Sequence, residues 1–107
     1  AKGKEELEPA LKLANTAYFM NRDNPTVLDT LGWIHFKKGN MQQAIQLLTD
    51  AVEKNPQQPL WNYHLGAALA ANGQKSEANG YLQKSIVGDK DSPWKADAQK
   101  LLEDTKQ

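Results

Sequence analysis

Few side chains in this sequence could do chemistry, and those few stand apart from one another. The chain has two histidines, His35 and His64, and no cysteine. A metal site needs three or four ligands, and neither histidine has a second ligand at helical spacing. The absence of cysteine excludes disulfides, thiolate nucleophiles and cysteine-based zinc or iron–sulfur sites. The sequence therefore predicts no metal and no other cofactor.

Hydroxyl and carboxylate groups form no catalytic pattern either. Ser76, Ser85 and Ser92 have no base at a recognisable spacing, and a nucleophile needs both a base and an oxyanion-stabilising group. Acidic clusters at residues 5–6 and 89–91 fall at the ends of predicted elements, where they suit solvation or capping. No glycine-rich loop follows a strand, which excludes a phosphate-cradling motif. We predict that the chain is not an enzyme.

Length and charge restrict the classes of partner. The 107 residues, of which 39% are apolar, suit one folded domain. Thirteen basic residues offset thirteen acidic ones, which argues against nucleic acid or an anionic membrane as partner. No apolar run approaches the roughly 18 residues of a membrane span, so we expect neither membrane insertion nor a targeting signal in this stretch. The cellular compartment stays open.

A repeat of 34 residues organises the whole chain. Prolines stand at Pro25, Pro59 and Pro93, each 34 residues after the last. The same offset joins further pairs: Leu31 and Leu65, Gly32 and Gly66, Gly39 and Gly73, Ala44 and Ala78, and Leu48 and Leu82. Apolar residues within each unit recur at three and four residues, which predicts two helices per unit. Pro25 suits a first helical turn, Gly39 a helix end and Asn55-Pro56 the end of the next helix.

This helix–turn–helix unit resembles the tetratricopeptide repeat, whose pattern is W-x2-L-G-x2-Y, then A-x3-F, then A and P. In the first unit these places hold Leu28, Leu31, Gly32, His35, Ala44, Leu48, Ala51 and Pro56. In the second they hold Asn62, Leu65, Gly66, Leu69, Ala78, Leu82, Ser85 and Lys90. Asn62 stands where the family has tryptophan, and Trp61, one residue earlier, is expected to supply the packing. The resemblance implies an all-α solenoid of about six helices wound into a right-handed superhelix.

The flanks follow the same spacing. We expect residues 1–24 to hold the second helix of a truncated preceding repeat, 25–58 and 59–92 to be full repeats, and 93–107 to be a C-terminal capping helix. Because Pro9 suits only a first turn, the first helix should start near Leu7 or Glu8. With its partner helix missing, that helix should expose part of an apolar stripe formed by Leu7, Ala10, Leu11, Ala14 and Tyr18. The chain would then be a monomer or would associate weakly with itself through this face.

A second stripe on the first helix of each repeat lies apart from the core stripe. In the first repeat it consists of Thr26, Asp29, Trp33, Phe36 and Lys37; the equivalents are Leu60, Tyr63, Ala67 and Ala70, and then Trp94 and Asp97. In tetratricopeptide proteins this face lines the concave groove that receives a peptide or a partner helix. The resemblance therefore implies a non-catalytic module for protein–protein interaction, with a protein or peptide as partner. The other interpretation is that the aromatic residues only pack between helices.

Two finer resemblances bear on the role of the module. Domains of this family that clamp acidic chain ends use basic and amide side chains on this face, whereas this sequence has Asp29 and Asp97 there, which argues against that role. The segments 27–34, 63–66 and 96–102 resemble the C-terminal end of tetratricopeptide lipoproteins of bacterial PEP-CTERM protein sorting and exopolysaccharide export. That resemblance implies an envelope protein. The alternative function is accordingly a purely structural end of a longer repeat array with no ligand of its own.

Overall fold

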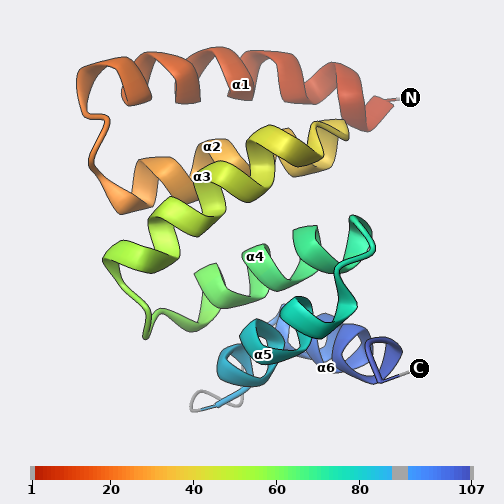
Figure 1. The fold of residues 1–107 in the computed structure, drawn as a ribbon. Helices are drawn as coiled ribbons and strands as arrows, with labels where there is room; N and C mark the ends of the chain where they lie inside the picture. The colour runs from red at the N-terminus through yellow and green to blue at the C-terminus, as the bar shows by residue number, and fades with distance from the viewer. Residues whose placement is uncertain (1, 88–91, 107) are drawn as a thin grey trace. The chain divides into compact units, whose positions relative to one another are not determined.

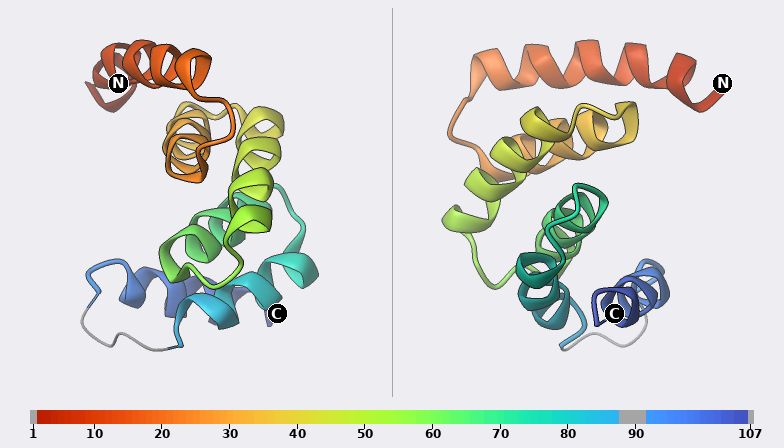
Figure 2. Two further views of the ribbon diagram at one scale, coloured as in Figure 1. Left: turned by 90° about the vertical axis from the view of Figure 1, so that its left-hand side faces the viewer. Right: turned by 45° about the vertical axis from the view of Figure 1, so that its right-hand side comes forward.

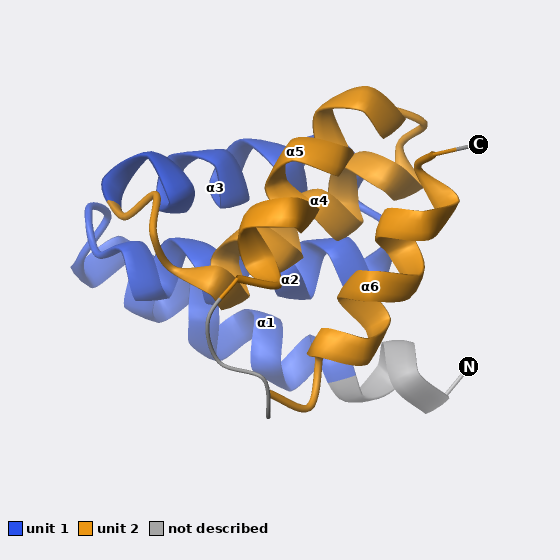
Figure 3. Ribbon diagram, turned by 90° about the horizontal axis from the view of Figure 1, so that it is seen from below, with its two compact units in different colours: residues 1–54 blue, residues 55–107 orange. Residues whose placement is uncertain are grey.

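A computed structural model describes residues 2–87 and 92–106, with side chains from residue 7 onward (Figure 1). These residues form six helices and no strand. The helices are α1 (Lys2–Met20), α2 (Pro25–Lys38), α3 (Met41–Lys54), α4 (Pro59–Ala71), α5 (Lys75–Ser85) and α6 (Lys95–Asp104). The chain divides into two compact units, Ala1–Lys54 and Asn55–Gln107, which are coloured in Figure 3 and described in turn.

Local signals set the ends of α2, the first helix of the first full repeat. Oδ1 of Asn24 accepts hydrogen bonds from the backbone N–H groups of Thr26 at 2.9 Å and Val27 at 3.4 Å. Pro25 follows in the first turn, where its missing N–H costs no hydrogen bond. Gly39 ends the helix with φ of 87°, a left-handed conformation that favours glycine. The proline and glycine spacing thus predicted both ends of α2 correctly.

A small residue lets the two helices of each hairpin approach closely. A Cβ atom on Gly32 of α2 would lie 2.8 Å from Cγ of Leu48 on α3. In unit 2, a Cβ atom on Gly66 of α4 would lie 2.7 Å from Cγ of Leu82 on α5. Both leucines are completely buried. The same glycine–leucine contact therefore holds each hairpin together.

Helix α1 differs from the prediction at its start. It begins at Lys2 rather than near Leu7 or Glu8 and continues through Pro9, which lies inside the helix. Proline cannot donate the intrahelical hydrogen bond, a loss that tertiary packing of the rest of the helix can outweigh. The side chain of Glu8, next to that proline, pairs with Lys38 at the end of α2.

The apolar stripe of α1 packs against α2. Ala14 is buried against Leu31 and Ile34 of α2, and the rest of the stripe is partly buried around that cluster: Leu7, Ala10, Leu11 and Tyr18. Helix α1 packs against α2 (Figure 2). The large apolar side chains that α1 does expose are Leu13, Phe19 and Met20. The stripe is thus exposed only in part because it packs on α2, and the exposed large apolar side chains of α1 lie outside it.

In unit 2, α4 is buried on every side from Trp61 to Leu69. Asn62 is 1% exposed, and its Nδ2 donates to the backbone oxygens of Pro56 at 3.0 Å and Gln58 at 2.9 Å. The residue in the tryptophan place of the repeat therefore fastens the preceding turn, while Trp61 is buried beside it as expected.

Helix α6 packs on α5 and α4. A hydrogen bond of 2.9 Å from Asn79 to Thr105 links α5 to the residue that follows α6. The helix begins at Lys95, two residues later than the position of Pro93 predicted.

Candidate functional site

Unit 1 presents a stacked aromatic pair on α2. The rings of Trp33 and Phe36 lie 4.7 Å apart between centroids and 15° from parallel, and both side chains are half-buried. Nζ of Lys37 lies 5.8 Å from the centre of the Trp33 ring, within range of a cation–π interaction. Thr26 and Lys37 are exposed, whereas Asp29 is buried at 5% exposure. We call these five predicted residues the Trp33 surface; its accessible part is aromatic and cationic.

Unit 2 presents a second pair made by two elements. Tyr63 of α4 stacks on Trp94, which directly precedes α6, with ring centroids 5.3 Å apart and 17° from parallel. Burial raises the pKa of the Tyr63 hydroxyl, and the nearby carboxylate of Asp97 raises it further. Tyr63, Trp94 and Asp97 were predicted to occupy equivalent faces, and the structure brings the three together within one unit.

The remaining predicted residues of unit 2 differ in accessibility. Ala67 is buried, as is Tyr63, whereas Leu60, Ala70 and Trp94 are half-buried and Asp97 is exposed. Among these six predicted residues Asp97 is thus the most accessible to a partner, and Leu60, Ala70 and Trp94 are accessible in part. We call Leu60, Tyr63, Ala67, Ala70, Trp94 and Asp97 the Tyr63 surface.

The two histidines have packing roles. Nδ2 of Asn40 lies 3.1 Å from Nδ1 of His35, and because the amide can only donate, Nδ1 is the acceptor of a neutral ring. Burial lowers the pKa of His35, which also favours the neutral form. His64 is buried, with its ring 5.7 Å from that of Tyr63.

The side chains that the sequence offered for catalysis or metal binding are described in part, among residues 7–87 and 92–106. The hydroxyl of Ser85 is buried and donates to the backbone oxygen of Leu82 at 2.6 Å. Within those ranges no three histidine, aspartate or glutamate side chains come together as metal ligands. The acidic side chains at 5–6 and 89–91 lie outside the described part of the chain.

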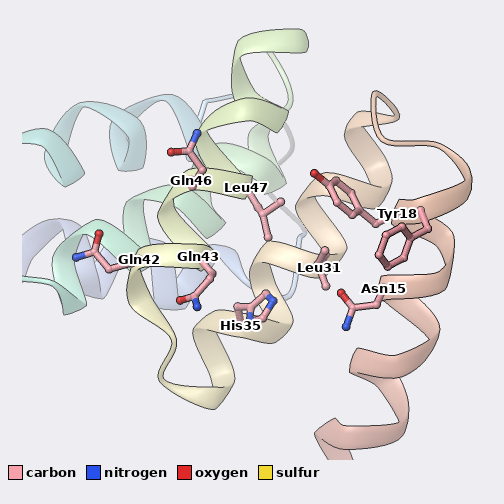
Figure 4. A pocket seen from close by; sticks show the side chains of 9 residues that line it. Asn15, Tyr18, Leu31, His35, Gln42, Gln43, Gln46 and Leu47 are labelled. Atoms are coloured by element: carbon pink, nitrogen blue, oxygen red, sulfur yellow. The ribbon is translucent and has the colours of Figure 1, made fainter.

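A groove in unit 1 was not predicted from the sequence. It lies between α1 and α3 over α2 and has a volume of about 530 Å³ (Figure 4). Its lining residues are Asn15, Tyr18, Phe19, Leu31, His35, Gln42, Gln43, Gln46 and Leu47. The signal that could have found it is the group of three glutamines at the start of α3.

Comparison with known proteins bears on this architecture. The profile of the tetratricopeptide repeat matches residues 35–104, about two thirds of the chain. The chain belongs to the tetratricopeptide repeat family. A TPR repeat-containing protein of Pseudomonas aeruginosa is 34% identical over 47 residues, which are 44% of this chain and 8% of that protein. The chain therefore spans a small part of the length of this relative.

A solved structure extends the comparison to the fold. The crystal structure of PcrH in complex with the chaperone binding region of PopD superimposes with a TM-score of 0.78 at 16% identity. The match covers 95% of this chain and 80% of that one. The predicted all-α tetratricopeptide fold is thereby confirmed. In the described part of this tetratricopeptide chain, no helix is long and apolar enough to span a membrane.

Proposed function

We propose that this tetratricopeptide chain is a non-catalytic protein-interaction module, in which the Trp33 surface and the Tyr63 surface contact a peptide or helical segment of a partner protein. The observation that carries the proposal is the pair of half-buried stacked rings on α2, Trp33 and Phe36. Aromatic side chains of this kind are enriched among the residues that contribute most binding energy at interfaces.

The repeat itself does not require these rings. The residues 34 positions later are Ala67 in place of Trp33 and Ala70 in place of Phe36, and α4 packs without an aromatic side chain there. Trp33 is thus only partly covered by its neighbours, at a position where the repeat tolerates alanine. Both facts favour a role for Trp33 in contacting a partner. Lys37 beside Trp33 would favour an acidic group at the edge of the partner segment.

The likeness to PcrH supports the class of partner. That structure holds the chaperone binding region of PopD, so a helical repeat of this fold can bind a segment of another protein.

The proposal is tested by truncating Trp33 and following binding and stability together. After an unbiased capture has identified a partner of the wild-type chain, Trp33→Ala should weaken binding of that partner by about 2 kcal/mol or more. Losing the stacked pair should cost only about 1 kcal/mol of folding stability, a shift of several degrees in Tm.

Leu13→Ala is the matched control, because Leu13 is an exposed apolar residue outside both surfaces. This variant should shift the Tm by no more than a few degrees and should leave the affinity for the partner unchanged. If Trp33 is core packing instead, Trp33→Ala should cost about 3–5 kcal/mol and lower the Tm by well over ten degrees. That result would contradict the proposal.

The alternative role, a structural segment of a longer repeat array, has its own supporting observation. Leu13 and Met20 on α1 are 74% and 83% exposed, as large apolar side chains would be if another helix normally covered them. Under this alternative Trp33→Ala would leave every captured partner bound. The resemblance to envelope lipoproteins belongs to this alternative.

A further inference from the structure

The groove of unit 1 arises because two helices pack on a third without meeting. Both α1 and α3 pack on α2, and their backbones do not come together. The space left over α2 has Leu31 and His35 at its base and Leu47 on the α3 side (Figure 4). At about 530 Å³ it falls within the range of roughly 300–1,000 Å³ that is usual for ligand sites.

The lining of this groove combines apolar surface with amides and carries no formal charge. Leu31, Leu47 and the rings of Tyr18 and Phe19 supply the apolar part, and Phe19 is 69% exposed. Amide side chains stand on both edges, with Asn15 on α1 and Gln42, Gln43 and Gln46 on α3. His35 is held neutral by its contact with Asn40. The charges nearest to the lining are of opposite sign: Arg22 lies over the rings of Tyr18 and Phe19, and Asp50 accepts a hydrogen bond from Gln46. The surroundings therefore favour neither sign of charge on a ligand, and a charged ligand would lose hydration here.

Most of these amides have unused hydrogen-bonding capacity. Within the described part of the chain the side chains of Asn15, Gln42 and Gln43 make no hydrogen bond, and Gln46 donates only to Asp50, at 3.3 Å. Each primary amide offers donors and an acceptor, which is the complement of a peptide group.

The repeat does not explain the glutamines. At the positions 34 residues later the second repeat has Ser76 for Gln42, Glu77 for Gln43 and Gly80 for Gln46. Because α5 forms with these other residues, the fold leaves the three positions free. Their identity in the first repeat therefore calls for a reason other than helix packing.

We propose that this groove binds an extended, uncharged segment of a partner protein, whose main chain pairs with Asn15 and Gln43 and whose apolar side chain enters between Leu31 and Leu47. An extended segment suits the groove better than a helix, because a helix satisfies its own backbone groups and would leave the edge amides unpaired. Phe19 then packs over the inserted side chain, and its exposed ring becomes buried.

This site is separate from the Trp33 surface. On a helix that turns about 100° per residue, Trp33 and Phe36 point roughly 100–160° away from Leu31 and His35. The two faces of α2 can thus be occupied independently.

The test uses short capped peptides and the whole chain. Pentapeptides acetylated and amidated at their ends, with a central leucine or phenylalanine flanked by glycine and serine, are titrated into isotope-labelled protein. The side-chain amide resonances of Asn15 and Gln43 and the methyl resonances of Leu31 and Leu47 should shift. Peptides with a central glutamate or lysine should leave them unchanged. Equal shifts with charged peptides, or none with any peptide, would overturn the proposal.

A matched pair of variants tests the role of the amides. Gln43→Glu keeps the shape of an exposed side chain but removes its donor, and should weaken peptide binding by about tenfold or more. Gln57→Glu makes the same change of net charge in an exposed turn outside the groove and should leave binding unchanged. An equal loss in both variants would mean that net charge is responsible, and would contradict the assignment.

Two further measurements identify the occupant and the site. Trp33→Ala should leave the peptide-induced shifts in place, so this proposal and the proposed function can fail separately. Diluting the free protein should leave the same resonances unmoved. Movement on dilution would show that a second copy of the chain fills the groove, and the proposal would then be wrong.

Discussion

The two repeats build the same helical hairpin and then use its surfaces differently. Each begins with a proline and places a glycine of its first helix against a fully buried leucine of its second. Yet α2 is buried along a limited set of residues, whereas α4 is buried on every side from Trp61 to Leu69. The residues that recur are therefore those that hold two helices together. Those that change determine what each hairpin offers to other molecules.

The changes cluster on two sides of the first hairpin. Trp33 and Phe36 of α2 are replaced by alanines in α4, and Gln43 of α3 is replaced by Glu77 in α5. The aromatic pair and the amide-edged groove are thus additions to a common frame. We therefore expect substitutions in the aromatic pair or the groove to cost little folding stability. Substitutions in the shared glycine–leucine contact should cost much more.

The largest expected effect comes from removing the shared leucine. Leu48→Ala and Leu82→Ala should each lower the free energy of unfolding by about 2–5 kcal/mol, because each empties a fully buried position. Denaturant melts measure the loss. Amide exchange should quicken mainly in α2 and α3 for the first variant and in α4 and α5 for the second, since repeats interact chiefly with their neighbours. Equally fast exchange in the other hairpin would show that the two hairpins open as one cooperative unit and would contradict this.

Two glycines of unit 2 should respond to alanine with opposite sign. Gly80 lies in α5 with nothing within 4 Å of an added Cβ, so Gly80→Ala should stabilise by roughly 1 kcal/mol through helix propensity. Gly66→Ala gains the same propensity but drives a Cβ into Leu82, at a cost of about 1–3 kcal/mol. We expect a net loss for Gly66→Ala in the same thermal melts. If both variants were more stable than the wild type, the close approach of α4 to α5 at Gly66 would not be required.

The smallest effect is a pH dependence carried by His35. Its pKa lies below the ordinary 6.5 because burial disfavours the charged ring. Between the folded and unfolded pKa values the unfolded chain binds more protons, so stability falls as the pH drops below about 6.5. His35→Leu, which copies Leu69 of the second repeat, should remove this part of the loss when Tm is followed from pH 7.5 to 5.5. A variant whose Tm falls as steeply as that of the wild type would contradict this.

The ends of the repeat helices could be predicted because residues close to each end determine them. Pro25 and Gly39 act through backbone conformation within one or two turns, so the ends of α2 could be inferred without knowing what packs on it. The start of α1 could not be inferred in this way. Pro9 lies inside a helix that packs on α2, and the residues around the proline carry no signal of that packing.

The Trp33 surface and the Tyr63 surface could be predicted in part, because residue spacing is also a local signal. Helical spacing put Trp33 and Phe36 on one face, and the 34-residue offset put Tyr63, Trp94 and Asp97 in corresponding places. Spacing could not indicate that Asp29 and Ala67 are buried, because burial depends on neighbouring helices. The groove was missed because its edges come from α1 and α3, which are joined only through α2.

The amide of Asn62 has a consequence for engineering this chain. Repeat proteins are often improved by restoring the consensus residue at each position, and here that rule would put tryptophan at 62. The change would remove both hydrogen bonds that fasten the turn at Pro56 and Gln58, and it would place a second indole next to Trp61 in a space already filled. The two hydrogen bonds lie within seven residues, so the segment can be transplanted as a unit: residues 56–62 moved together into another array would bring both hydrogen bonds with them.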